Sequence, residues 1–188
     1  MMTRNPKKPI AMSKTKTTLE LGTLTITGTA VVADPCYRFD GTWTAAVIKG
    51  LKPGKYHAYV TIVDEGPMWG KRASELWIAR ESNKRNRAHE YTGIHLPVDS
   101  GSMGIYSEDY YMKYHLFPEG TYVNDEENPV EHAWYDRQFD ERYNNKLEAK
   151  VLDDSCAISF SGYGDGTYPL YEGRNSHGEL VALRVRFI

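Results

Sequence analysis

The sequence predicts a mainly β protein of the α+β kind: an antiparallel sheet sandwich or partly open barrel with one amphipathic helix around residues 129–143. Short runs that alternate apolar and polar side chains recur along the chain, separated by glycine, proline, asparagine and aspartate. This pattern is typical of half-buried strands joined by turns. The 188 residues suffice for one core of ordinary size. We therefore expect a single β-rich domain over residues 18–188.

The expected strands follow one another along the chain. Residues 19–33 read as two short strands, and residues 56–62 alternate after a turn at 52–54. Residues 76–79 form another apolar run, entered after the loop 64–71. The clearest half-buried strand lies at the C-terminus, where apolar side chains of residues 181–187 share one face and two arginines point the other way.

The expected helix lies between two of these strand regions. Asn128 can cap it, Pro129 can open its first turn, and Tyr135, Phe139 and Tyr143 fall on one stripe at i, i+4 and i+8. Its other side is charged and should face water. The economical arrangement is one helix packed on a sheet-based core.

The N-terminal segment differs from the rest of the chain in charge. Residues 1–17 contain five of the 23 basic residues and none of the 25 acidic ones. We expect these residues to form a basic, flexible arm exposed to solvent. The arm is the only candidate contact for nucleic acid, and nucleic acid is not an expected partner.

Nothing in the sequence predicts insertion into a membrane. Apolar runs are only a few residues long, far below the roughly 20 needed to cross a bilayer, and the first 18 residues lack the apolar stretch of a secretory signal. The expected location is the cytoplasm, that of the host cell if the gene belongs to a phage. Cys36 and Cys156 form no C-x-x-C pair, so two reduced thiols are expected.

Common catalytic signatures are missing. The chain has no phosphate-binding G-x-x-x-x-G-K-[ST], no dinucleotide-binding G-x-G-x-x-G, no H-E-x-x-H, no G-x-S-x-G and no C-x-x-C pair. The six histidines are scattered singly, and a lone histidine is more often a surface or core residue than a metal ligand. These absences favour a protein without catalytic activity.

Five short turns that contain an aspartate are present instead. They span residues 33–37, 64–70, 98–101, 134–136 and 161–169. Each turn alone has a structural explanation, because aspartate bonds its own backbone and glycine allows positive φ. Three glycines within residues 162–166 cost more backbone entropy than a simple hairpin needs. Close approach of a ligand or of another backbone would explain that cost.

The candidate site depends on whether these turns converge in space. If they do, their carboxylates would bind either a polar ligand or a hard cation such as Ca²⁺ or Mg²⁺. No cofactor is expected, since no calcium-binding loop is present; Asp34, Asp99 and Asp165 are the ligands if a cation binds. Aromatic side chains in the same turns suit a pocket for a base, a sugar or a peptide side chain. The candidate ligand-binding residues are Asp34, Tyr37, Asp64, Glu65, Trp69, Asp99, Ser100, Trp134, Tyr135, Asp136, Tyr163, Asp165 and Tyr168.

The motifs occur in a recognisable order: TGTAVVADPCY, PGKYHAYVTIVDEG, ASEL, VDSGSMGIY, WYD and SGYGDGTYPLYEGR, closing on LVALRVRFI. This series, over most of residues 24–188, resembles an uncharacterised family of small β-rich proteins of bacteria and their phages. The resemblance implies a fold and a genomic setting but no reaction. Where relatives often carry a cysteine after Trp-Tyr-Asp, this chain has Phe139. A cysteine-based site is therefore not expected, and Cys36 should be buried and inert.

Three functions fit these observations. The preferred one is a non-catalytic binding protein, a phage accessory factor that captures a small polar ligand or a host protein in a pocket of aspartate and aromatic turns. The first alternative is a metal-assisted hydrolase of a phosphate or glycan, with Glu65 or His95 as base. The second alternative is a structural component of a virion or other assembly, tied in by the basic arm.

Overall fold

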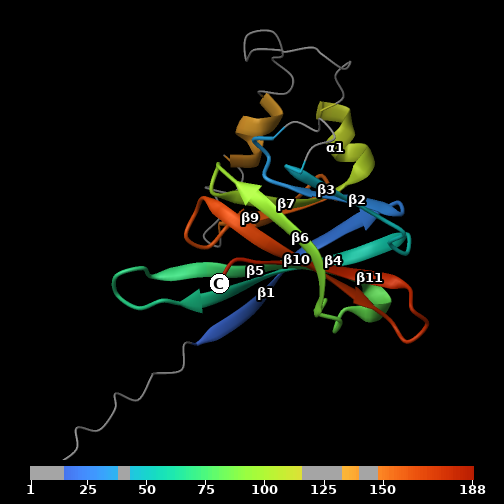
Figure 1. Cartoon of the computed structure of the whole chain (residues 1–188), viewed down its shortest axis with the longest axis horizontal. Helices are drawn as coiled ribbons and strands as arrows, with labels where there is room; N and C mark the ends of the chain where they lie inside the picture. Colours follow the sequence, from blue (N-terminus) through green and yellow to red (C-terminus); the bar gives the residue numbers. More distant parts are fainter. Residues whose placement is uncertain (1–14, 38–42, 116–132, 140–147) are drawn as a thin grey trace, which may run out of the picture.

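The structure, a computed structural model, describes residues 15–37, 43–115, 133–139 and 148–188. Two antiparallel sheets pack face to face and do not close into a barrel, which confirms the predicted sandwich (Figure 1). The six-stranded sheet has the order β1 (Lys16–Ile26), β4 (Gly54–Asp64), β5 (Lys71–Arg80), β11 (Leu180–Arg186), β10 (Gly166–Arg174) and β6 (Glu90–Val98). The five-stranded sheet has the order β3 (Ala45–Lys49), β2 (Thr29–Ala33), β7 (Ser102–Ser107), β9 (Cys156–Phe160) and β8 (Ala149–Leu152).

The main core lies between the two sheets. Alternate side chains of β4 and β11 point into it, as their sequence pattern predicts, and examples are Val60, Leu183 and Val185, all fully buried. Full burial of one such side chain stabilises the fold by roughly 1.5–3 kcal/mol. The local alternation of these strands therefore gives each of them a defined inner face.

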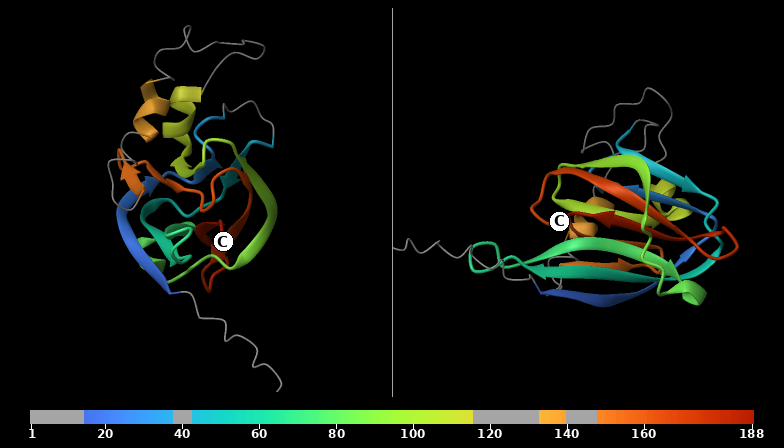
Figure 2. Two further views of the ribbon diagram at one scale, coloured as in Figure 1. Left: turned by 90° about the vertical axis from the view of Figure 1, so that its left-hand side faces the viewer. Right: turned by 60° about the horizontal axis from the view of Figure 1, so that its bottom comes forward.

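A second core covers the outer face of the five-stranded sheet. It is built by α1 (Glu108–His115) and by a second short helix that includes residues 133–139, and Figure 2 shows both on the outer side of this sheet. The predicted helix is thus confirmed over residues 133–139, while residues 129–132 and 140–143 lie outside the described part of the chain. The sequence reading missed α1. Its signal was Ser107 followed by Glu108 and Asp109, since acidic residues favour the first turn of a helix.

The outer face of the six-stranded sheet is partly covered by the segment between β5 and β6. This segment starts with a 3₁₀ turn, η1 (Glu81–Asn83). Ala88 is fully buried against Trp77 and Ala182, and Arg87 reaches across to the Thr18 hydroxyl at 3.0 Å. The basic loop is therefore held against the sheet.

The edge strands β1 and β8, one from each sheet, lie close together at one end. The Thr25 N–H donates to the Asp154 carbonyl at 2.8 Å, and Gly22 packs against Val151. β1 begins at Lys16, and residues 1–14 of the predicted arm are outside the described residues. None of the helices in the described part of the chain is long and apolar enough to cross a membrane.

Candidate binding site

The turn after β2 is locked to the turn between β6 and β7 by Asp34. Its carboxylate is fully buried and accepts hydrogen bonds from the Cys36 N–H at 2.8 Å and the Asp99 N–H at 2.8 Å. Ser100 donates both its N–H, at 2.7 Å, and its hydroxyl, at 2.5 Å. Four charge-assisted bonds compensate the burial of this charge. Both oxygens are occupied, so Asp34 acts as a structural clamp.

Tyr37 adds a further link between these two turns. Its hydroxyl donates to Asp99 at 2.6 Å, and its carbonyl accepts the hydroxyl of Tyr111 from α1 at 2.7 Å. Desolvation and the bond to Asp99 raise the pKa of Tyr37 above its ordinary value. The expectation that Cys36 is buried is wrong. Residue 36 is exposed because it lies in the turn after β2, outside the sheet, whereas Cys156 is buried.

The glycine-rich turn after β9 packs against the turn between β6 and β7. The Ser161 N–H donates to the Gly101 carbonyl at 3.1 Å, and the Ser161 hydroxyl donates to the Gly164 carbonyl at 2.7 Å. The Tyr168 hydroxyl lies 2.9 Å from the Ser161 carbonyl and 2.7 Å from that of Gly164. Tyr168 is buried, and its hydroxyl therefore holds this turn in place from the side of the core.

Close packing accounts for Gly162, one of the three glycines within residues 162–166 whose combined cost the sequence analysis noted. Gly162 has φ +66°, and a Cβ there would lie 3.0 Å from the Phe187 Cβ and 3.1 Å from the Ala73 carbonyl oxygen. Only glycine fits this combination of positive φ and close approach. Contact with the neighbouring segments that contain Phe187 and Ala73 therefore explains the glycine at position 162, and no ligand is required there.

The loop between β4 and β5 joins the glycine-rich turn. Within the loop, the Gly66 N–H donates to the Asp64 carboxylate at 2.9 Å. Between the two, the Tyr163 hydroxyl donates to Glu65 at 2.7 Å, and the Arg72 guanidinium donates to the Gly162 carbonyl at 3.3 Å. The loop is thus held in place by side chains at both of its ends.

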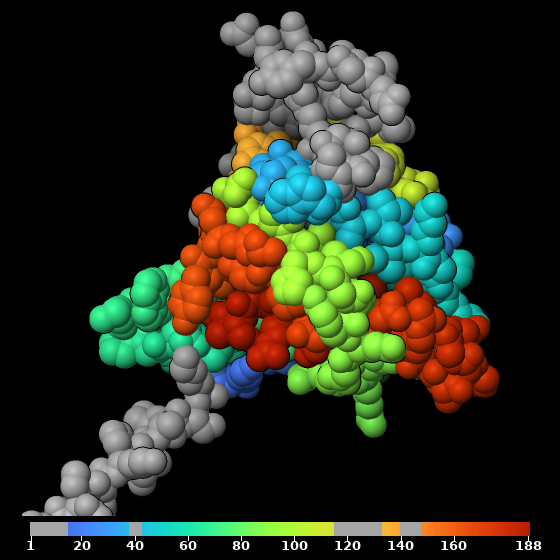
Figure 3. Space-filling model, viewed as in Figure 1, coloured from blue at the N-terminus to red at the C-terminus, as the bar shows by residue number. Residues whose placement is uncertain are grey.

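Side chains at this junction form an exposed surface, here named the hairpin platform. It consists of Glu65, Met68, Trp69, Arg72 and Tyr163. The rings of Trp69 and Tyr163 meet edge to face at 5.4 Å, and the Arg72 guanidinium lies 5.6 Å and 6.0 Å from their centroids. Met68 is 83% exposed, Trp69 50% and Tyr163 49%. Figure 3 shows the β4–β5 hairpin, in green, projecting from the body of the molecule.

Four of the five predicted turns therefore form a continuous row, in the order 34–37, 99–101, 161–164 and 64–70. The row brings together Asp34, Tyr37, Asp99 and Ser100 at one end and Asp64, Glu65, Trp69 and Tyr163 at the other. Asp165, next to the row, is exposed and forms no side-chain hydrogen bond with the described residues. Sequence reasoning missed Arg72 and Met68, whose signal was their closeness to Trp69 in the chain: Met68 precedes it in the loop, and Arg72 is the second residue of β5.

The fifth turn is separate from the row. Trp134, Tyr135 and Asp136 lie on the second helix, where Trp134 is buried and stacks on Tyr114 at 5.5 Å. Its ring also packs against Tyr106 at 5.9 Å. Trp134 thus holds the helix on the sheet.

No group of three or more histidine, cysteine, aspartate or glutamate residues within the described ranges could hold a metal ion. Asp34 could join a cation site only by giving up its hydrogen bonds. His95, the other candidate base, lies on β6, where its Nδ1 is 2.8 Å from the Tyr91 hydroxyl. Glu65 is bonded to Tyr163.

The two sheets and the row of interlocked turns define the class of this protein: a β-sandwich with a preformed face at one end. Residues 24–185 match a family described as protein of unknown function (DUF4241), and the chain belongs to that family. The match spans all six motifs from which the family resemblance was drawn. No curated protein and no solved structure matches the chain.

Proposed function

We propose that this protein is a non-catalytic binding protein and that the hairpin platform is its contact surface for a protein partner. The observation that carries the proposal is the exposed Trp69–Tyr163 pair, which is held in place by Glu65 and Arg72. The platform lies on the projecting β4–β5 hairpin, and this shape suits a protein better than a small ligand. The genomic setting implied by the motif series makes a host protein the proposed partner, with this chain as a phage accessory factor.

The composition of the platform supports a protein contact. Tryptophan, tyrosine and arginine are the residues that most often dominate binding energy at protein interfaces. Met68 adds a flexible apolar side chain that adapts to a partner's surface. Glu65 and Arg72 carry opposite charges, so the platform offers no strong net charge to a nucleic acid or to a metal ion.

The order of the platform before binding also supports the proposal. A flexible loop would lose conformational entropy on association, which weakens binding. Here the bonds from Tyr163 to Glu65 and from Arg72 to the Gly162 carbonyl already fix the loop. The aromatic pair is therefore presented at little further cost.

Affinity capture with matched tryptophan variants tests the proposal. Wild-type protein, Trp69→Ala, Tyr163→Ala and Trp43→Ala are immobilised and exposed to host extract, and the captured protein is then purified and titrated by calorimetry. Trp43 is the control, because it is 70% exposed but lies outside the platform. Each platform variant should weaken binding at least 10-fold, as expected for a loss of more than 1.4 kcal/mol, with Trp43→Ala unchanged. Equal binding by all four proteins would refute the proposal.

A further inference from the structure

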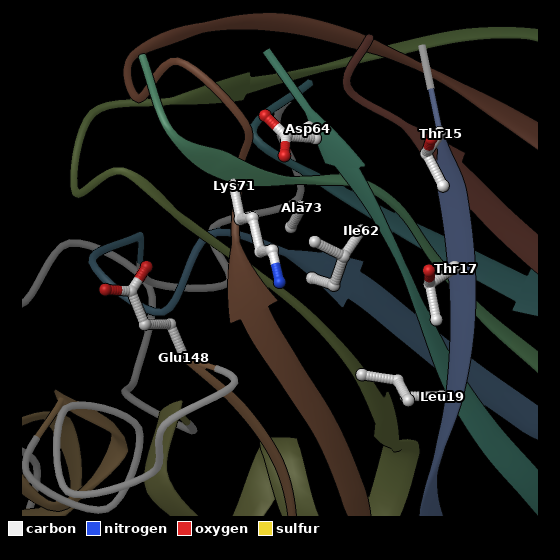
Figure 4. A pocket seen from close by; sticks show the side chains of 8 residues that line it. All are labelled: Thr15, Thr17, Leu19, Ile62, Asp64, Lys71, Ala73 and Glu148. Atoms are coloured by element: carbon white, nitrogen blue, oxygen red, sulfur yellow. The ribbon is translucent and has the colours of Figure 1, made fainter. Parts of the chain in front are cut away.

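A cavity of about 570 Å³ lies beside the edge strand β1, next to the ends of β4 and β5 from which the loop of the hairpin platform extends (Figure 4). One wall is the start of β1, the facing wall is the residue before β8, and the floor comes from β4 and β5. The two edge strands that touch at Gly22 and Val151 are thus separated here by a hollow. The lining residues are Thr15, Thr17, Leu19, Ile62, Asp64, Lys71, Ala73 and Glu148.

The floor of the cavity is apolar. Leu19 and Ile62 are partly buried and pack against the main core, and Ala73 is buried within it. Their side chains present hydrocarbon surface at the level where the sheets separate. An apolar group of a ligand would gain roughly 25 cal/mol for each Å² that it buries on this floor.

Lys71 supplies a positive charge inside the cavity. Figure 4 shows its side chain extending into the hollow toward Ile62. Asp64 is its cross-strand neighbour, yet the Asp64 carboxylate points away from it in Figure 4 and bonds the Gly66 N–H. Within the described part of the chain, the Lys71 ammonium has no hydrogen bond or ion pair, so its donors are available to a ligand.

Glu148 supplies a negative charge at the facing wall. Its backbone has φ +51°, in the left-handed region that residues with a side chain rarely adopt. The Glu148 carbonyl accepts the Phe160 N–H at 3.0 Å, which holds this conformation in place. The start of β8 is therefore fixed, and Glu148 stands on the rim of the cavity, where Figure 4 shows its carboxylate turned away from Lys71. Rotation about the bonds of this exposed side chain would bring the carboxylate over the hollow, as contact with a ligand's ammonium group requires.

We propose that this cavity binds a small zwitterion with an apolar side chain, of the size of a free amino acid. Lys71 would bind its carboxylate, Glu148 its ammonium group, and the floor its apolar side chain. The hydroxyls of Thr15 and Thr17 provide further donors and acceptors. The proposal goes beyond the proposed function, because it assigns a second ligand to a different surface.

The charges of the lining select among ligand classes. One ammonium and two carboxylates, those of Asp64 and Glu148, give the lining a negative sum. A polyanion such as a nucleotide would meet repulsion from both carboxylates. A simple amine would leave the Lys71 ammonium without a partner, and a simple carboxylate would leave Glu148 without one. A zwitterion matches both signs, and the cavity volume is within the usual range for small-molecule sites.

Three probes of similar shape test this. L-leucine carries both charges, 4-methylpentanoate lacks the ammonium group, and 3-methylbutylamine lacks the carboxylate. Titration followed by two-dimensional NMR should show that leucine binds at least tenfold more tightly than either analogue. Leucyl-leucine is a fourth probe, and tighter binding than leucine would identify a peptide rather than a free amino acid as the source of the same chemistry.

Charge-removing variants assign the roles. Lys71→Gln should weaken the binding of leucine at least tenfold, so that leucine no longer binds more tightly than 3-methylbutylamine. Glu148→Gln should abolish its advantage over 4-methylpentanoate. Lys55→Gln, at an exposed position elsewhere on β4, should change nothing, and thermal unfolding checks that each variant is folded.

Two results would overturn the proposal: no binding of any probe, or leucine affinity unchanged in folded Lys71→Gln. Trp69→Ala should leave leucine binding intact, so failure of this proposal and failure of the platform proposal can be told apart.

Discussion

Asp34 and Ser100 stand 66 residues apart in the chain and are joined by two hydrogen bonds, from the Ser100 N–H at 2.7 Å and from its hydroxyl at 2.5 Å. Asp34 follows a strand of the five-stranded sheet, and Ser100 follows a strand of the six-stranded sheet. The pair therefore fastens the two sheets together at the end where the turns are aligned.

Replacing Asp34 by Asn should lower the free energy of unfolding by about 2–4 kcal/mol. The amide keeps the shape of the side chain, but its NH₂ group faces an N–H donor and leaves a buried bond unmade. Ser100→Ala removes one bond and should cost about 1 kcal/mol. Urea unfolding measures both, with the exposed Asp165→Asn as control at no more than about 0.5 kcal/mol. An Asp34→Asn value as small as the control's would show that the clamp is not needed for stability.

Two glycines with the same backbone angle separate strain from packing. Gly162 and Gly70 both have φ +66°, but a Cβ at Gly70 has nothing within 4 Å, whereas at Gly162 it meets Phe187 and Ala73. Gly162→Ala should therefore be less stable than Gly70→Ala by about 1–3 kcal/mol, the usual cost of overpacking. Thermal and urea unfolding of the two variants provide the comparison. Equal losses of stability in the two variants would mean that the segments containing Phe187 and Ala73 shift to make room for the added methyl group.

The docking of the second helix should depend on pH. Arg137 on this helix holds Asp153 with two bonds of 2.7 Å, and this guanidinium lowers the pKa of Asp153. A lowered folded-state pKa gives stability that is fully present above the unfolded value of about 3.9 and is lost as the pH falls toward the folded value. Asp153→Asn should thus be less stable than wild type at pH 7, and the gap should shrink below about pH 4. Urea unfolding from pH 7 to pH 3 measures both proteins. A constant difference in unfolding free energy between wild type and Asp153→Asn over this range would contradict the predicted pH dependence.

The two thiols should react in different ways. Desolvation and the Asp34 carboxylate raise the pKa of Cys36, and burial raises the pKa of Cys156. Cys36 is exposed, so iodoacetamide should modify it in the native protein at pH 8, but at least ~10-fold more slowly than in urea, because the thiolate is the reactive form. Cys156 should react only after unfolding. Mass spectrometry of tryptic peptides follows both sites, and modification of Cys156 in the native protein would contradict the expectation.

The strands were predictable because their signal is local. Residues 56–60 alternate in burial as they do in sequence, since each side chain has only two faces to choose from. Residues 181–185 are buried on both faces, because the segment between β5 and β6 covers Ala182 and the Arg184 guanidinium pairs with Glu75. α1 was missed because its aromatic side chains pack on the sheet and on the second helix, and no spacing within Glu108–His115 reports such partners. Helices this short depend on tertiary packing for their stability.

The site was predictable only in part. The sequence marked the turns, but their order in space rests on contacts between distant residues, such as Gly101 with Ser161 and Glu65 with Tyr163. Trp134 was grouped with the site because an aromatic next to an aspartate resembles a binding turn, whereas its buried ring packs against Tyr106 and Tyr114. Lys71 was not predicted as a site residue, because a single lysine belongs to no sequence motif that indicates binding.

The same long-range contacts set when the hairpin platform can form during synthesis. Trp69 and Glu65 leave the ribosome well before Tyr163, which follows Glu65 by 98 residues, and Phe187, against which Gly162 packs, is synthesised later still. An incomplete chain can form the β4–β5 hairpin yet cannot orient its tryptophan against tyrosine. The proposed partner would therefore find no ordered surface on chains that end before residue 163.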